Sequence, residues 1–196
     1  MKKILLTAAA VAVLTASPVY AEEGDFFLKA NVGGVKLNKM NSFKSDNNMY
    51  FGVGAGYNLM DNARVDLAYD HFFEPTFKRS GDGISSKTKL NIDTILLNGF
   101  VDVVDLSVAK IFTGAGVGVA RIGGKQTDTD AAGVSESIKY KAENKFGYAL
   151  YLGSSTEFAP GVNAELTYSW RGYSKLKDAD KNLQGHHISA GVRFDI

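Results

Sequence analysis

The sequence contains no cysteine and only three prolines, and beyond its first 21 residues it has no apolar run long enough for a membrane-spanning helix. The lack of cysteine excludes a small secreted scaffold held together by disulfides. The formal net charge of +1 is too small to indicate binding to nucleic acid. The chain must therefore be held by a core or by a closed hydrogen-bonded sheet, and its 21 glycines suit long strands better than helices.

The first 21 residues have the pattern of a secretory signal peptide. Lys2 and Lys3 precede a short apolar run over 4–14, and Ala21 is the small residue at the expected cleavage point. The apolar run is shorter than the ~20 residues that a membrane-spanning helix needs. We therefore expect residues 1–21 to be removed and residues 22–196 to form a single domain.

Apolar and polar residues alternate with a period of two along most of the mature chain, which predicts strands. In the weakest of these segments, Ile95 and Leu97 blur the alternation. There we expect the outer, apolar face to carry Leu90, Ile92, Thr94, Leu96 and Phe100. The eight predicted strands cover residues 26–33, 49–57, 63–73, 90–101, 109–119, 146–153, 162–171 and 187–196.

The connections between these strands alternate in length. Short turns are expected around 58–62, 102–105 and 159–161. Long polar loops are expected at 38–47, 74–88, 122–142 and 174–185. This asymmetry is typical of a bacterial outer-membrane barrel, with tight periplasmic turns, long outer loops and both termini on the periplasmic side. The last strand, which runs to Ile196, would then pair with the first and remove the free edge.

The polar face of the strands decides which way the barrel faces. A soluble barrel of the lipocalin type would place the apolar face inside. Eight strands enclose only enough room for side chains, and mixed charges can pair there. Aromatic residues near strand ends, Phe100 and Tyr173 among them, suit membrane interfaces. We predict an all-β, eight-stranded antiparallel up-and-down transmembrane β-barrel. Its lumen charge network is expected to comprise Lys29, Arg64, Asp66, Asp70, Glu165, Arg171 and Arg193.

Three stretches resemble the rickettsial surface adhesins of the opacity-like, outer-membrane protein X-like barrel family. They are ILLNGFVDVVDLSVAKIFTGAGVGVA (95–120), GVNAELTYSWRGYSK (161–175) and GHHISAGVRFDI (185–196). The resemblance implies a virulence-related protein of a Gram-negative outer membrane that binds host-cell or serum proteins through its outer loops. Barrels of this family commonly end in an aromatic residue read by the barrel assembly machinery. This chain has Phe194 and then Ile196 instead.

The patterns that would suggest chemistry are weak, and we expect no catalytic residue, cofactor or metal site. His187 and Ser189 have the His-x-Ser spacing of outer-membrane lipid A deacylases, but no downstream Glu follows to orient the histidine. Asp66 and Asp70 suit a structural ion-pair network better than an acid–base pair. The glycines of GAGVG (114–118) precede no helix, so we expect them to make room for facing lumen side chains.

Counted over 38–47, 74–89, 122–142 and 174–185, the four long loops carry twelve basic residues against eight acidic ones. This excess would suit either the phosphates of lipopolysaccharide or an acidic host surface. Adhesion through the loops is the favoured function, a structural or small-solute barrel is the alternative, and a lipid A-modifying enzyme is the third reading. The candidate contact residues are Lys78, Arg79, Lys125, Lys139, Lys175 and Lys177.

Overall fold

The computed structural model describes residues 25–38, 44–45, 48–81, 84–129, 135–174 and 182–196, which form one antiparallel sheet. The expected signal peptide lies outside these residues. No helix in the described part of the chain is long and apolar enough to cross a membrane. The strands are β1 (Phe26–Leu37), β2 (Lys44–Ser45), β3 (Asn48–Met60), β4 (Ala63–Phe72), β5 (Thr76–Gly81), β6 (Ile84–Asp105), β7 (Lys110–Thr129), β8 (Ser135–Ala159), β9 (Val162–Tyr173) and β10 (Leu183–Asp195).

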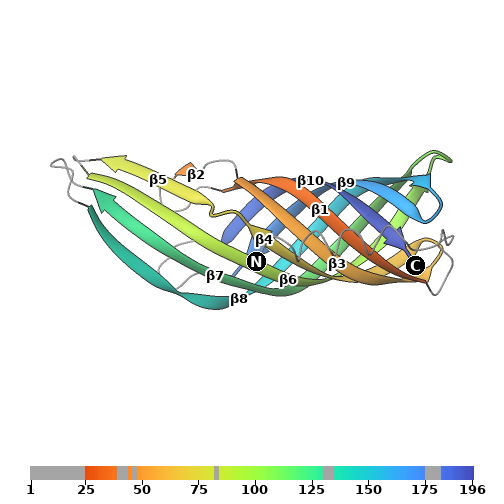
Figure 1. Ribbon diagram of the computed structural model, residues 1–196, viewed down its shortest axis with the longest axis horizontal. Coiled ribbons are helices and arrows are strands. Elements are labelled where there is room, and N and C mark those ends of the chain that lie inside the picture. The colour runs from red at the N-terminus through yellow and green to blue at the C-terminus, as the bar shows by residue number, and fades with distance from the viewer. Residues whose placement is uncertain (1–24, 39–43, 46–47, 82–83, 130–134, 175–181) are drawn as a thin grey trace, which may run out of the picture.

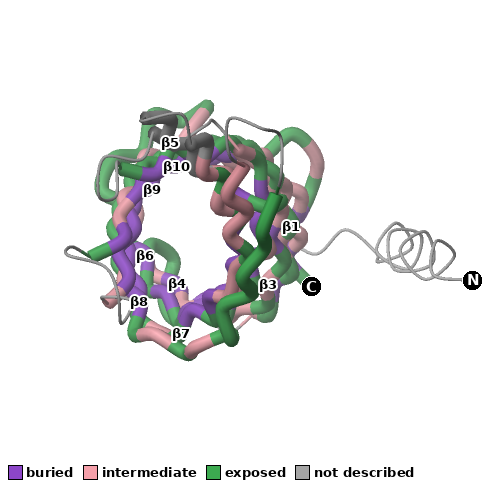
Figure 2. Tube along the Cα trace, turned by 90° about the vertical axis from the view of Figure 1, so that its left-hand side faces the viewer, coloured by how far each residue is buried: buried purple, intermediate pink, exposed green. Residues whose placement is uncertain are grey.

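Eight of these strands close into a ring, which Figure 2 shows end-on. Each pairs antiparallel with its neighbour, and β10 closes on β1 from the pair Phe27 and Asp195 to the pair Leu37 and Gly185. The short β2 and β5 are additions outside the ring, because β2 pairs with β5 and β5 pairs with β6. The predicted eight-stranded antiparallel barrel is confirmed.

The two ends of the barrel differ (Figure 1). One end, here called the turn rim, carries the start of β1, the end of β10 and the short turns after β3, β6 and β8. Gly161 adopts a positive φ of 70° in the turn between β8 and β9, and its carbonyl accepts a hydrogen bond from the amide of Asp195. The opposite end, the loop rim, carries the longer connections.

Side chains alternate between the lumen and the outside of the ring, and the glycines on the inward face make room for larger partners. A Cβ on Gly116 would lie 1.9 Å from the Asn98 side chain, and one on Gly52 would lie 2.1 Å from Asp70. Both positions therefore require glycine because a polar lumen side chain occupies the space. The prediction that the glycines of 114–118 serve close packing is confirmed at Gly116.

The face assignment predicted for 90–101 is wrong. Ile95 and Leu97 are the exposed residues, at 53% and 57%, so they form the outward face of β6. The five residues expected outside are buried in the lumen. Strand β6 carries apolar residues on both faces because the lumen itself holds two apolar clusters, so hydrophobicity alone could not choose between them. The buried residues are Leu90, Ile92, Thr94, Leu96 and Phe100.

Two of the expected long loops are instead largely strand. Residues 84–88 belong to β6, and most of 122–142 belongs to β7 and β8, which pair as far as Thr129 and Ser135. Together with β5 they form a sheet that reaches beyond the other strands at the loop rim (Figure 1). We call this the projecting sheet; it comprises β5, residues 84–93 of β6, 121–129 of β7 and 135–145 of β8. These strands extend past the barrel because their backbones pair with one another, and not because their side chains are apolar.

Candidate functional site

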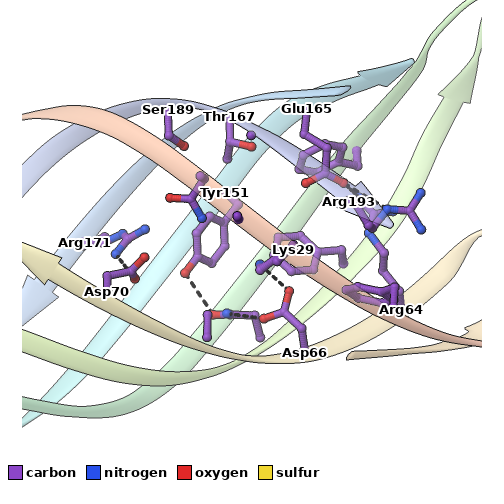
Figure 3. A pocket seen from close by; sticks show the side chains of 18 residues that line it. Lys29, Arg64, Asp66, Asp70, Tyr151, Glu165, Thr167, Arg171, Ser189 and Arg193 are labelled. Atoms are coloured by element: carbon purple, nitrogen blue, oxygen red, sulfur yellow. Dashed lines mark hydrogen bonds and ion pairs between the residues drawn. The ribbon is translucent and has the colours of Figure 1, made fainter. Parts of the chain in front are cut away.

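The centre of the lumen is filled by a buried ion pair (Figure 3). The Arg171 guanidinium lies 2.7 Å from Asp70 and donates a second hydrogen bond to the Ser169 hydroxyl at 3.1 Å. It also lies 5.2 Å from the centre of the Tyr50 ring and 5.8 Å from that of Tyr151. Because both charges are almost fully removed from water, each depends on the other for compensation.

A second group of polar side chains lies beside this pair. The Lys29 ammonium is hydrogen-bonded to Asp66, and the Asn98 amide donates to the same carboxylate at 2.7 Å. The Tyr151 hydroxyl donates to the Asn98 carbonyl oxygen at 2.9 Å. The chain of contacts from β1 through β4 and β6 to β8 links opposite walls of the barrel.

A third group lies toward the turn rim. Arg64 forms ion pairs with Asp102 at 2.6 Å and with Glu165 at 3.6 Å. Arg193 shares Glu165 at 3.3 Å and also contacts Asp195. All seven residues expected in the lumen thus lie inside the barrel, grouped in three networks of mixed charge. Asp102, Asn98, Tyr151 and Asp195 take part as well, although alternation alone did not single them out.

These side chains leave a cavity of about 40 Å³ between them, which is room for a very few water molecules at most. We therefore expect the refolded protein in planar bilayers to give no large, stable single-channel conductance. Steady openings in the range of a water-filled porin would contradict this filled lumen.

The loop-rim end of the lumen is closed by an apolar cluster that sequence reasoning missed. Tyr173 belongs to this cluster and is fully buried, so the prediction that it lies at the membrane interface is wrong. The sequence of β1 could have predicted this cluster, because the alternation that places Phe27 and Lys29 in the lumen continues to the apolar residues Val35 and Leu37. The cluster consists of Val35, Leu37, Tyr50, Phe72, Leu90, Ile92, Ala120, Ile122, Tyr173 and Leu183.

His187 and Ser189 lie on the inward face of β10, and no described contact makes them a catalytic pair. The His187 ring packs edge-on against Tyr50 and Phe72, with ring centres 5.5 and 5.6 Å apart. Neither ring nitrogen of His187 has a hydrogen-bond partner among the described residues. Within the same residues, no group of His, Asp and Glu is arranged to hold a metal ion.

The tip of the projecting sheet, residues 126–129 and 135–140, is polar and cross-linked between its strands. Thr127 pairs with Ser137 at 3.0 Å and Thr129 with Ser135 at 2.9 Å through their hydroxyls. On the other face, the Tyr140 hydroxyl donates to the Gln126 side chain at 2.7 Å. The tip is thus a braced hairpin.

The six candidate contact residues divide into three groups. Lys78 and Arg79 lie in β5, whereas Lys175 and Lys177 lie outside the described residues. Lys125 and Lys139 lie directly opposite each other in β7 and β8, both exposed. All four described candidates therefore belong to strands of the projecting sheet, which corrects their expected position in loops.

The outside of the barrel, below the projecting sheet, is a continuous apolar belt. Such a surface on a closed ring, with charges paired inside, defines a transmembrane β-barrel, because every backbone group in the ring is paired internally. The short turns, the start of β1 and the end of β10 then mark the periplasmic rim, and the loop rim is extracellular. Exposed belt residues include Leu28, Val32, Val53, Leu67, Ile95, Leu97, Val117, Val119, Leu150, Leu152, Leu166 and Ile188.

Comparison with known proteins agrees with this class. Residues 6–195 match the outer membrane protein β-barrel domain, and the chain belongs to that family. It is therefore a protein of the Gram-negative outer membrane. A Rickettsia conorii protein named as a candidate adhesin is 38% identical, and one from Rickettsia felis is 32% identical, each covering all of both chains.

Solved structures that share the fold include two bacterial surface proteins. Neisserial surface protein A has a TM-score of 0.64 at 20% identity, covering 86% of this chain and 96% of its own. The attachment invasion locus protein Ail of Yersinia pestis has a TM-score of 0.50 at 18% identity, covering 88% of this chain and 99% of its own.

Proposed function

We propose that this protein is a surface adhesin that binds a protein of the host-cell surface or of serum through the tip of its projecting sheet. The observation that carries the proposal is the length of β8. At 25 residues, it is more than twice the ~9–11 residues that a membrane-spanning strand needs. The extra length holds a braced hairpin outside the cell. The candidate-adhesin names of its relatives support the same function.

The chemistry of the tip suits protein recognition. Ile138 and Tyr140 are 57% and 43% exposed and stand on one face of β8. Gln126, Asp128 and Glu136 stand on the same face of the hairpin, so the surface combines two large anchors with adaptable polar groups. Binding surfaces commonly use this combination, with a few large side chains supplying most of the energy.

The alternatives have less support. A small-solute barrel needs a passage, and the lumen is filled by paired charges and closed by an apolar cluster. A lipid A-modifying enzyme would need His187 to orient a nucleophile, whereas its ring lies among aromatic side chains. We therefore propose a function without catalysis. Host contact, lipopolysaccharide contact and recognition of β10 by the barrel assembly machinery make up the partners of this proposal.

The proposal is tested by shortening the hairpin. Residues 126–138 are replaced by Asn-Gly, which joins the directly opposed Lys125 and Lys139 through a two-residue turn. Refolded protein is then added to labelled host cells and to immobilised serum proteins. We expect binding to fall at least tenfold, because the anchor Ile138 and the braced polar surface are lost together.

A finer variant separates recognition from folding. The double substitution Ile138→Ser and Tyr140→Ser keeps the strand pairing but removes both anchors, and we expect about a thirtyfold loss of binding. The matched control, Lys125→Gln with Lys139→Gln, changes the opposite face and should bind host material like the natural chain. Undiminished binding by both the shortened and the anchor variants would refute the proposed contact surface.

A further inference from the structure

The outward face of β6, β7 and β8 changes abruptly above the apolar belt. Because the β6–β7 pairing is unbroken from Ser85 to Asp102, every second residue of both strands stays on this face. The highest apolar row consists of Ile95, Val119 and Phe146, each at least 50% exposed. The next row consists of Asp93, Arg121 and Asn144.

Farther toward the extracellular end, three lysines stand side by side. Lys89 is directly opposite Lys125, and Lys125 is directly opposite Lys139. Side chains opposed in this way have Cβ atoms about 4.5–5.5 Å apart, and like charges there destabilise the sheet. A row of three ammonium groups on three adjacent strands therefore calls for a compensating anion. We call Lys89, Lys125 and Lys139 the lysine row.

The acidic groups nearby are already engaged. Glu74 lies 2.7 Å from Lys89, and the hydrogen bond from that ammonium lowers the pKa of Glu74. Asp93 accepts hydrogen-bond contacts at 2.7 Å from both His71 and Tyr69. Neither Lys125 nor Lys139 has an ion-pair partner among the described residues.

The lysine row borders a hollow of about 740 Å³ on the outer surface of the projecting sheet. Arg121 lines its lower side and Lys87 its upper side. The hollow is thus lined by five cationic side chains beside Glu74 and Asp93, and among the described residues only one of the five, Lys89, forms an ion pair, with Glu74. Its shape and charge suit a large anion better than a single water-sized ion.

The height of the lysine row above the apolar belt distinguishes between two kinds of membrane anion, phospholipid headgroups and the larger headgroup of a phosphorylated glycolipid. With a strand rise of about 3.4 Å and a tilt of about 40°, Arg121 lies about 5 Å above the last apolar row, and the lysine row lies about 15 Å above it. The polar layer of a phospholipid leaflet is only about 6 Å deep. The lysine row therefore stands above phospholipid headgroups, but beside the thicker sugar headgroup of a phosphorylated glycolipid.

We propose that the lysine row and Arg121 form a binding site for the phosphorylated saccharide headgroup of lipopolysaccharide in the outer leaflet. The occupied site would compensate the opposed lysines and anchor the base of the projecting sheet to the membrane surface. This inference does not depend on the adhesin function, because it uses the opposite face of the hairpin from Ile138.

The test uses the refolded mature protein in phosphatidylcholine nanodiscs. Short-chain lipopolysaccharide carrying lipid A and inner-core sugars is titrated in, and the bound amount is measured by native mass spectrometry. We compare the natural chain with Lys125→Gln/Lys139→Gln and with the control Lys36→Gln/Lys110→Gln, which removes equal charge from exposed sites on β1 and at the turn rim. We expect about a fivefold loss of affinity per lysine removed from the row, hence about 25-fold.

Three further arms define the ligand. Removing the phosphates from lipopolysaccharide should weaken its binding to the natural chain at least as much as the Lys125→Gln/Lys139→Gln substitutions weaken binding of intact lipopolysaccharide. The hairpin-shortened chain keeps Lys125 and Lys139 and should keep its glycolipid. Equal loss in the Lys36/Lys110 control, or no loss in the lysine-row variant, would overturn the site. The site would also be overturned if the natural chain bound soluble sucrose octasulfate, a polyanion without a lipid, more tightly than the glycolipid.

Discussion

Replacing Arg171 with methionine is expected to destabilise the barrel by about 3–5 kcal/mol, because it leaves Asp70 charged and uncompensated in the lumen. Arg171 is 4% exposed and Asp70 is 2% exposed, so water cannot take the place of the missing partner. The measurement is urea unfolding of the refolded protein in phospholipid vesicles. Trp170, the single tryptophan of the chain, supplies the fluorescence signal.

The double variant Arg171→Met/Asp70→Asn decides whether the ion pair is the cause. With both charges removed, no buried charge remains unpaired, and we expect the double variant to be more stable than Arg171→Met alone by about 1–3 kcal/mol. Asp70→Asn keeps the size of the side chain that Gly52 accommodates, so packing changes little. If the two single losses simply add, the pair does not hold the lumen together in this way.

The charged residues of the lumen could be predicted from the sequence because they alternate with apolar residues, which shows on which face of each strand they lie. Lys29, Asp66 and Arg171 stood out on the inward positions of strands whose other face was apolar. Their mutual pairing then follows from burial, since an unpaired charge there costs too much. Which cation meets which carboxylate depends on strand register, and register is set by pairing between strands that lie far apart in the sequence.

The apolar half of the lumen was less visible. In 90–101 both faces are apolar, so the period of two is present but its phase is ambiguous. Leu96 packs inside with Phe100 and Phe112, while Leu97 faces outward. The pairing of β6 with β4, which sets Leu97 opposite Leu67, resolves the phase. Single-strand patterns could not supply that information.

The projecting sheet was missed for a related reason. Residues 122–142 are rich in Thr, Ser, Lys and Asp, a composition that indicates loops. Their strand structure comes from continuing the ladder that begins in the apolar belt, with Lys125, Thr127 and Thr129 each opposed on β6 and β8. A polar strand of this kind is set by its neighbours, so local sequence underestimates its length.

Leu97→Arg is expected to destabilise the barrel in vesicles by about 2 kcal/mol, because an arginine on the lipid face must be removed from water. The matched control is Asn91→Arg on the same face of the same strand, six residues nearer the extracellular end. There the side chain stands above the belt, and we expect a loss of about 0–1 kcal/mol. Urea unfolding followed through Trp170 measures both variants under one condition.

This pair of variants also tests the direction in which the barrel faces. In a water-soluble barrel, an exposed leucine changed to arginine would alter stability by no more than about 0.5 kcal/mol, and depth along the strand would not matter. In the membrane, the two sites differ because Leu97 contacts hydrocarbon, whereas Asn91 stands about 10 Å above the last apolar row, beyond the ~6 Å polar layer of a phospholipid leaflet. Equal, small losses at Leu97 and Asn91 would contradict the lipid-facing belt on which the extracellular position of the projecting sheet depends.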